Sequence, residues 1–135
     1  MKWGLDTTVI VRLLSGDPPD QAEVARKTLA SLKAAGEIPI VDDLAIAEAY
    51  FALSYHYGIP KADVLAALRR FLSSGDVIAT GVAANILNIE NLAVAKPGFV
   101  DRVIHAVYQQ RDTTLITFER ASAKLPGVRV LRWKT

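Results

Sequence analysis

Apolar residues along the 135-residue chain form two kinds of pattern: short unbroken runs, and longer stretches with a helical period. Short runs are typical of strands covered on both faces, whereas apolar residues three and four apart indicate amphipathic helices. The runs predict strands at 1–5, 38–41, 76–81, 113–118 and 128–133. The third of these could also be an extended link, and the stretch 8–14 fits either a strand or a helix.

Between these runs, the periodic stretches carry the residues that begin and end helices. Asp17 is a candidate N-cap for the first long helix, and Gly36 follows its end. Asp42 and Asp43 offer caps for a helix that reaches about Tyr57. Helices are predicted from their period at 18–35, 43–57, 61–72, 83–94 and 99–110, with a short helical turn at 120–124.

Strands that alternate with helices predict a single α/β domain over residues 1–135, with a mainly parallel sheet. The composition agrees, because 51% of residues are apolar and 22% are charged. The absence of cysteine excludes disulfides and thiolate chemistry and fits a reducing, cytoplasmic location. No apolar run is long enough to span a membrane, and Asp6 interrupts the first run too early for a signal peptide. A net charge of +2 permits a polyanionic partner without arguing for one.

Two acidic residues directly follow predicted strands: Asp6 after the first and Glu119 after the fourth. In an open parallel sheet, the carboxyl ends of the strands form the edge that carries the ligand site. Each acid also has a simpler interpretation, because Asp and Glu commonly cap helices and turns at such positions.

Two further acids lie on predicted helices. Glu48 has the helical spacing of Leu44 and Phe51, which places it on an apolar stripe where an unpaired carboxylate is costly. Asp101 lies in the first turn of its helix, beside the expected core stripe of Val100, Val103, Ile104 and Val107. A salt bridge for Glu48 and a favourable helix-dipole interaction for Asp101 remain alternatives. Four carboxylates gathered at one edge would need a multivalent cation, and oxygen ligands suit Mg²⁺ or Mn²⁺.

The chain resembles the PIN domain family, and within it the VapC-type toxins of toxin–antitoxin pairs. The resemblance covers nearly the whole chain through four segments. These are LDTTVIVRLLSGD at the start, LAIAEAYFAL around Glu48, FVDRVIHAV around Asp101, and LITFERASAKLPGVRVL at the end.

The resemblance implies a three-layer α/β/α fold, with a central five-stranded parallel sheet of order 3-2-1-4-5 flanked by helices. It implies a Mg²⁺- or Mn²⁺-dependent endoribonuclease that forms a homodimer and is inhibited by a small antitoxin. The acidic site of the family maps to Asp6, Glu48, Asp101 and Glu119. In this interpretation Asp6, Glu48 and Asp101 carry the principal metal, and Glu119 completes the site or holds a second one. A metal-bound water then attacks the RNA phosphodiester, and Glu48 is a candidate to orient or deprotonate that water.

Two positions depart from the family pattern. The family usually has Asp where this chain has Glu119, and often Asn or Ser where it has Thr8. Thr8 still supplies a hydroxyl, and Thr117 matches a hydroxyl position often found beside the site. The extra methylene of Glu119 bears on metal geometry, which is exacting for Mg²⁺.

Positive side chains near the acids are candidate contacts for RNA phosphates: Arg12, Arg102 and Arg120. For each, a solvated arginine is the alternative. We expect His105 to be a hydrogen-bonded core histidine and not a metal ligand. The aromatic residues Tyr50, Phe51, Tyr55 and Tyr57 pack inside the domain or face a partner. The alternative function is a PIN-fold module that binds RNA or protein with a weakened metal site. A phosphatase and a phospho-acceptor receiver fit less well, because position 8 is Thr and the segment ITFER at the end of the fourth strand contains no lysine.

Overall fold

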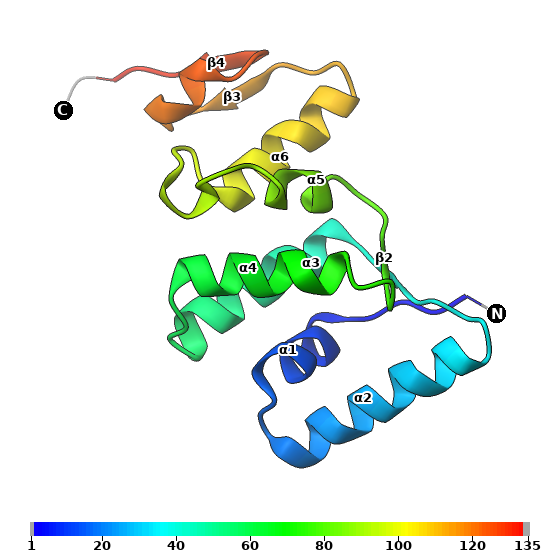
Figure 1. Ribbon diagram of the computed structural model, residues 1–135. Helices are drawn as coiled ribbons and strands as arrows, with labels where there is room; N and C mark the ends of the chain where they lie inside the picture. The colour runs from blue at the N-terminus through cyan, green and yellow to red at the C-terminus, as the bar shows by residue number, and fades with distance from the viewer. Residues whose placement is uncertain (1, 134–135) are drawn as a thin grey trace.

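The computed structural model describes residues 2–133 as helices and short parallel strands in stacked layers (Figure 1). The α-helices are α1 (Thr7–Ser15), α2 (Pro19–Ala34), α3 (Asp43–Phe51), α4 (Lys61–Leu72), α5 (Ala83–Leu87) and α6 (Phe99–Gln110). A π-helical segment, η1 (Ala52–His56), continues α3, and two 3₁₀ turns are η2 (Leu92–Val94) and η3 (Arg120–Lys124). The strands are β1 (Ile40–Val41), β2 (Ile78–Ala79), β3 (Leu115–Thr117) and β4 (Val128–Val130). Within residues 2–133, every helix is too short or too polar to cross a membrane.

The strands form two separate parallel pairs, β1 with β2 and β3 with β4. The N-terminal segment lies along the free side of β1. There the Leu5 amide donates to the Ile40 carbonyl at 3.0 Å, and the Ile40 amide donates to the Trp3 carbonyl at 2.9 Å. The spatial order β2, β1, N-terminal segment agrees with the 3-2-1 part of the predicted sheet.

The single five-stranded sheet is not formed by the described residues. Figure 1 places β3 and β4 beyond α6, at the opposite end of the molecule from the N-terminal segment. The pairing expected at the centre of the sheet, between the N-terminal segment and β3, is therefore not present among the described residues. The strands are also shorter than predicted, because most of the core is made by helix faces and not by a continuous sheet.

Helix boundaries follow their local signals closely. Residues 8–14, which fitted either a strand or a helix, belong to α1. Asp6 caps this helix, and Gly16 ends it with a φ of 70°, the left-handed value that favours glycine. The predicted helices 61–72 and 99–110 and the turn 120–124 have the bounds of α4, α6 and η3. The helix predicted at 83–94 is instead two short pieces, α5 and η2, separated by residues 88–91, of which Asn91 has a positive φ. Asp17 is not a cap, because α2 begins after Pro18.

The two consecutive aspartates before α3 have different roles. Asp42 caps α3 by accepting a hydrogen bond from the Ala45 amide at 2.9 Å. Asp43 reaches the start of α5, where it accepts hydrogen bonds from the Val82 and Ala83 amides at 3.1 and 3.0 Å. This long-range cap fixes the chain after β2 against α3. It also leaves no room for a side chain at the neighbouring Gly81.

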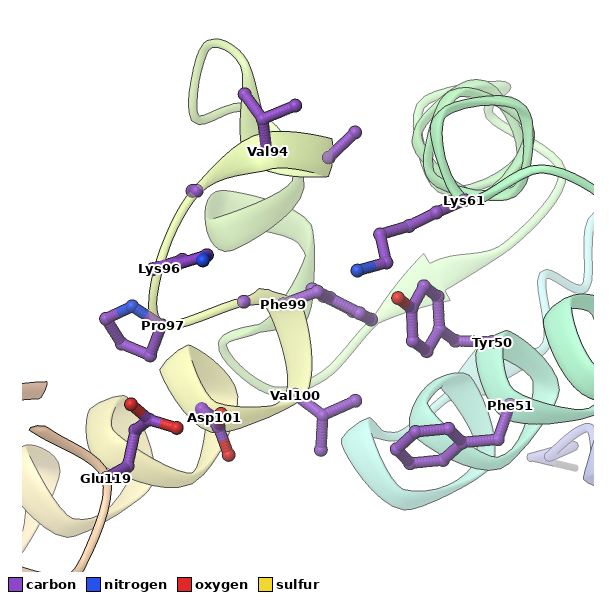
Figure 2. A pocket seen from close by; sticks show the side chains of 13 residues that line it. Tyr50, Phe51, Lys61, Val94, Lys96, Pro97, Phe99, Val100, Asp101 and Glu119 are labelled. Atoms are coloured by element: carbon purple, nitrogen blue, oxygen red, sulfur yellow. The ribbon is translucent and has the colours of Figure 1, made fainter. Parts of the chain in front are cut away.

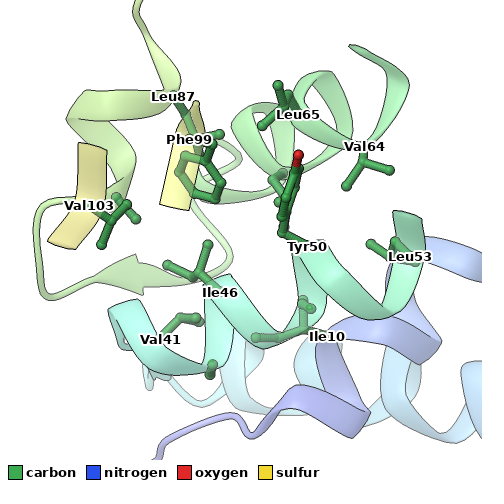
Figure 3. Packing of buried hydrophobic residues seen from close by; sticks show 14 of the residues in the cluster. Ile10, Val41, Ile46, Tyr50, Leu53, Val64, Leu65, Leu87, Phe99 and Val103 are labelled. Carbon is green, nitrogen blue, oxygen red and sulfur yellow. The ribbon is translucent and has the colours of Figure 1, made fainter. Parts of the chain in front are cut away.

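The core lies between α1, α3, α4 and the start of α6 (Figure 3). Its fully buried large side chains include Ile10, Ile46, Leu53, Val64 and Leu68. Tyr50 of α3 packs edge to face against Phe99 of α6, with ring centroids 5.3 Å apart. Both rings are buried, so this contact joins the C-terminal part of the chain to the helical core.

The face of α3 that was predicted to be buried is exposed. Leu44 and Phe51 are 69% and 42% exposed, and Glu48 between them is exposed as well. The buried face of α3 and η1 consists of other residues: Ala45, Ile46, Ala49, Tyr50 and Leu53. Almost every residue of this helix is apolar, so periodicity alone could not select the face. On α6 the predicted stripe is correct at Val103, which is buried, whereas Ile104 is 44% exposed.

A leucine pair tests this assignment of faces. We expect Leu68→Ala to lower the free energy of unfolding by about 2–5 kcal/mol, because its fully buried side chain would leave a cavity. The matched substitution Leu44→Ala should cost about 0.5 kcal/mol or less, because that side chain is mostly exposed. Urea unfolding followed by circular dichroism measures both. Equal losses in the two variants would contradict the described core.

Candidate active site

Asp6 lies between the N-terminal segment and α1, and its carboxylate caps that helix. Oδ1 accepts hydrogen bonds from the Thr8 hydroxyl at 2.6 Å and from the Val9 amide at 3.3 Å. These bonds, the Thr8 bond first, lower the pKa of Asp6, so the side chain is ionised at neutral pH. The simpler interpretation of Asp6 from the sequence, that it caps a helix, is therefore correct. Thr8 serves that cap, and its hydroxyl proton is directed at the carboxylate.

Glu119 has a similar local role at the other end of the molecule. It is the N-cap of η3, and its Oε1 accepts a hydrogen bond from the Ala121 amide at 3.0 Å. Thr117 supports the same turn, because its hydroxyl oxygen accepts from the Glu119 amide at 3.0 Å. The backbone thus fixes the position of the Glu119 side chain between β3 and η3.

Asp101 and Glu119 line one cavity of about 490 Å³ (Figure 2). Asp101 comes from the first turn of α6, and Glu119 from the connection between β3 and η3. In Figure 2 the two carboxylates lie on the same side of the cavity, with Tyr50 and Phe51 of α3 on the opposite side. The structure therefore brings together two of the four predicted acids.

Two lysines that the sequence analysis did not select line the same cavity. Lys61 begins α4, and Lys96 precedes the loop into α6 (Figure 2). Two positive and two negative side chains therefore line the same cavity, and lysine is a common phosphate ligand in proteins. Only the fold brings Lys61 near Asp101, since the two residues are 40 positions apart and no local motif contains both.

Glu48 lies on the exposed face of α3, outside the cavity of Asp101 and Glu119. It lines a mostly apolar groove of about 590 Å³ between α3 and α6, together with Leu44, Val100 and Ile104. It also lines a smaller cavity beside Thr7, next to Asp6 in the sequence. Phe51 borders all three spaces, and Glu48 lines two of them but not the cavity of Asp101 and Glu119.

The four acids do not fit a metal ion in this arrangement. Across residues 2–133, no three side chains of His, Cys, Asp or Glu are grouped closely enough to hold one. Asp6 and Glu48 belong to the N-terminal half, whereas Asp101 and Glu119 belong to the C-terminal part and share their cavity with two lysines. The prediction that one pocket contains all four carboxylates is not met here.

Each of the three arginines predicted to contact RNA phosphates interacts with another residue of the chain. Arg12 Nε donates to Gln21 Oε1 at 2.7 Å, and Arg102 Nε donates to the Pro97 carbonyl at 2.7 Å. Arg120 lies over the Trp133 ring, with 5.6 Å between the guanidinium carbon and the ring centroid. All three remain at the surface or half-buried, so the position of each is fixed by a neighbour.

His105 and the aromatic residues follow the expectations from sequence. His105 is buried, and its Nε2 lies 2.6 Å from the Pro126 carbonyl, as a hydrogen-bonded core histidine should. Among the four aromatic residues, Tyr50 is packed in the core, while Phe51 and Tyr55 stack on each other at the surface, with ring centroids 5.9 Å apart. Tyr57 donates its hydroxyl to the Asp17 carbonyl at 3.3 Å.

Comparisons with known proteins identify the family. Searches of curated proteins and of solved structures return no significant match. The family model of the PIN domain, in contrast, matches residues 5–128, which include Asp6, Glu48, Asp101 and Glu119. The match covers most of the chain, and the chain therefore belongs to the PIN domain family.

Proposed function

We propose that this PIN domain is an endoribonuclease that hydrolyses RNA phosphodiesters with Mg²⁺ or Mn²⁺. PIN domains are generally metal-dependent nucleases, which supports a hydrolase acting on phosphodiester bonds. The observation that carries the proposal is the cavity that Asp101 and Glu119 line together with Lys61 and Lys96. The ammonium groups can bind the RNA backbone, and a carboxylate can accept a proton from an attacking water.

The biological role that we propose is that of the toxin in a VapBC-type toxin–antitoxin pair. Support comes from the resemblance of the four sequence segments to VapC-type toxins. In this role the protein acts in the cytoplasm as a homodimer, and a small antitoxin inhibits it. A short neighbouring reading frame that encodes a DNA-binding antitoxin would support this role.

A second candidate is a PIN-fold module that binds RNA or protein with little catalysis. The observation that favours it is the division of the four acids between two parts of the molecule. The two candidates differ in one measurable property, because only a nuclease cleaves RNA when a divalent metal is added.

Catalysis by all four acids requires a more closed arrangement, which we include in the proposal. In the order 3-2-1-4-5, the N-terminal segment and β3 are neighbours, and each has one edge without a strand partner among the described residues. Pairing these edges would bring Asp6 and Glu119 closer, because Asp6 directly follows the N-terminal segment and Glu119 lies two residues after the end of β3. The apolar groove between α3 and α6 supports such a closure, since exposed apolar surface favours being covered.

Substitutions that remove charge but keep local hydrogen bonds test the role of the acids. We expect Asp6→Asn, Glu48→Gln, Asp101→Asn and Glu119→Gln each to lower the rate of RNA cleavage about 100-fold or more. Asn is as good an N-cap as Asp, and Gln can still accept from the Ala121 amide, so folding should be preserved. Glu119→Asp, which keeps the charge, should retain more activity than Glu119→Gln.

Cleavage of a labelled RNA in Mg²⁺ or Mn²⁺, with EDTA as the metal-free control, measures these effects. Glu90→Gln and Asp112→Asn are matched controls at exposed acids away from the cavity, and both should cleave like the wild type. Full activity in Asp6→Asn and Asp101→Asn would contradict the assignment. A wild-type protein that binds RNA without cleaving it would favour the binding module.

The closure is testable with spin labels, because the chain has no cysteine of its own. Lys2 and Thr113 precede the N-terminal segment and β3, so parallel pairing would bring these two positions together. We expect the label-to-label distance in a Lys2→Cys, Thr113→Cys variant to shorten when Mg²⁺ and a non-cleavable RNA are added. A control pair at Lys2 and Ala30, within the N-terminal half, should not change. An unchanged Lys2 to Thr113 distance in an active protein would contradict the closure.

A further inference from the structure

Two exposed aromatic side chains meet just after the ends of β3 and β4. Phe118 follows β3 and Trp133 follows β4, and the hydrogen bond from the Leu131 amide to the Thr117 carbonyl extends the pairing of the two strands toward them. The rings form an edge-to-face pair with centroids 5.2 Å apart. Phe118 is 59% exposed and Trp133 is 50% exposed. Burial in the core therefore does not explain this pair, and flat ring surface remains accessible to a ligand.

Positive charge surrounds the pair. The Arg120 guanidinium lies over the Trp133 ring, and Arg120 and Arg132 line a cavity of about 590 Å³ together with Trp133. The segment 120–133 contains four basic residues and no acidic one: Arg120, Lys124, Arg129 and Arg132. An anionic ligand with a flat apolar component matches both features of this surface.

Unpaired RNA has this chemistry. Proteins hold single strands by stacking bases on aromatic rings and by pairing backbone phosphates with arginine and lysine. Phe118 is the residue before Glu119, which lines the cavity of Asp101. RNA that stacks a base at Phe118 and Trp133 would therefore be held at the segment that carries Glu119.

We propose that Phe118 and Trp133, flanked by Arg120 and Arg132, form a platform that stacks an unpaired nucleobase of the RNA substrate. The inference rests on the proposed function only in taking RNA as the ligand, and it does not depend on cleavage. A platform of this kind selects single-stranded over double-stranded RNA, because bases in a duplex are already stacked on each other.

The test measures binding in EDTA, where a metal-dependent nuclease does not act. The probe is a fluorescein-labelled single-stranded RNA of twelve nucleotides with mixed sequence, followed by anisotropy. Loss of one stacked base weakens such complexes about 5- to 100-fold, and we expect this range for Trp133→Ala and Phe118→Ala. Trp133→Phe should bind better than Trp133→Ala, because it keeps an aromatic face. The matched control is Trp3→Ala, which removes another exposed tryptophan, on the N-terminal segment beside β1, and should bind like the wild type in EDTA.

Two further measurements use proteins in which Phe118 and Trp133 are both present, so their outcome does not depend on whether an alanine variant folds. The chain has two tryptophans, so a Trp3→Phe variant reports on Trp133 alone, and RNA should quench its fluorescence. Abasic sites in the RNA should weaken binding to the wild type, and should weaken it less in Trp133→Ala because the stacking contact is already absent. Absence of both effects would overturn the proposal.

The outcomes also separate this inference from the proposed nuclease. Wild-type affinity in Trp133→Ala, in a protein that cleaves RNA, would overturn the platform and leave the nuclease intact. RNA binding that depends on Trp133, without cleavage in Mg²⁺ or Mn²⁺, would support the platform and contradict the nuclease. If Trp133→Ala changes only the sedimentation of the protein and not its affinity for RNA, the pair is a contact between copies and the platform is overturned.

Discussion

The contact between Tyr50 and Phe99 determines how the two parts of the molecule meet. Tyr50 belongs to α3 in the helical core, and Phe99 begins α6, which leads into β3 and β4. Aromatic rings of this size bury much apolar surface and favour the edge-to-face geometry seen here. Both rings also border the cavity of Asp101 and Glu119, so the contact that attaches α6 to the core positions one wall of the candidate site. Burial also raises the pKa of Tyr50 above its already high ordinary value.

The helices could be predicted from the sequence more accurately than the strands or the buried faces of the helices. The bounds of α4 and α6 follow from signals within a few residues, such as Pro60 and Gly98 before their first turns. The face that α3 buries depends on what packs against it, and a helix that is apolar on nearly all sides carries no such information. The role of Asp43 was missed for a related reason, since its partners at Val82 and Ala83 are about 40 residues away.

The candidate site was predictable in its residues but not in its arrangement. Asp101 and Glu119 were selected because of their positions after a loop and after a strand, and they do line one cavity. Glu48 was selected for an apolar stripe that turned out to be the exposed face of α3, so the argument from burial was wrong. Lys61, Lys96 and the pair of Phe118 with Trp133 had no sequence signal of their own, because lysines and aromatic residues are common at surfaces and only the fold shows which of them meet.

The electrostatics of the acids explain why a divided site is stable. Four carboxylates in one pocket repel one another strongly, whereas Asp6 and Glu119 in the described arrangement each accept a backbone amide hydrogen bond. Asp101 gains from the positive end of the α6 dipole, and Lys61 and Lys96 offset the charge of its cavity. Bringing Asp6 and Glu48 to that cavity would add two negative charges to a balanced set. RNA is itself an anion and cannot compensate them, so a closed site with all four acids needs additional positive charge that enters with the substrate. The two caps use one carboxylate oxygen each, Asp6 Oδ1 and Glu119 Oε1, so in the proposed function the second oxygen of each acid would bind the added cation.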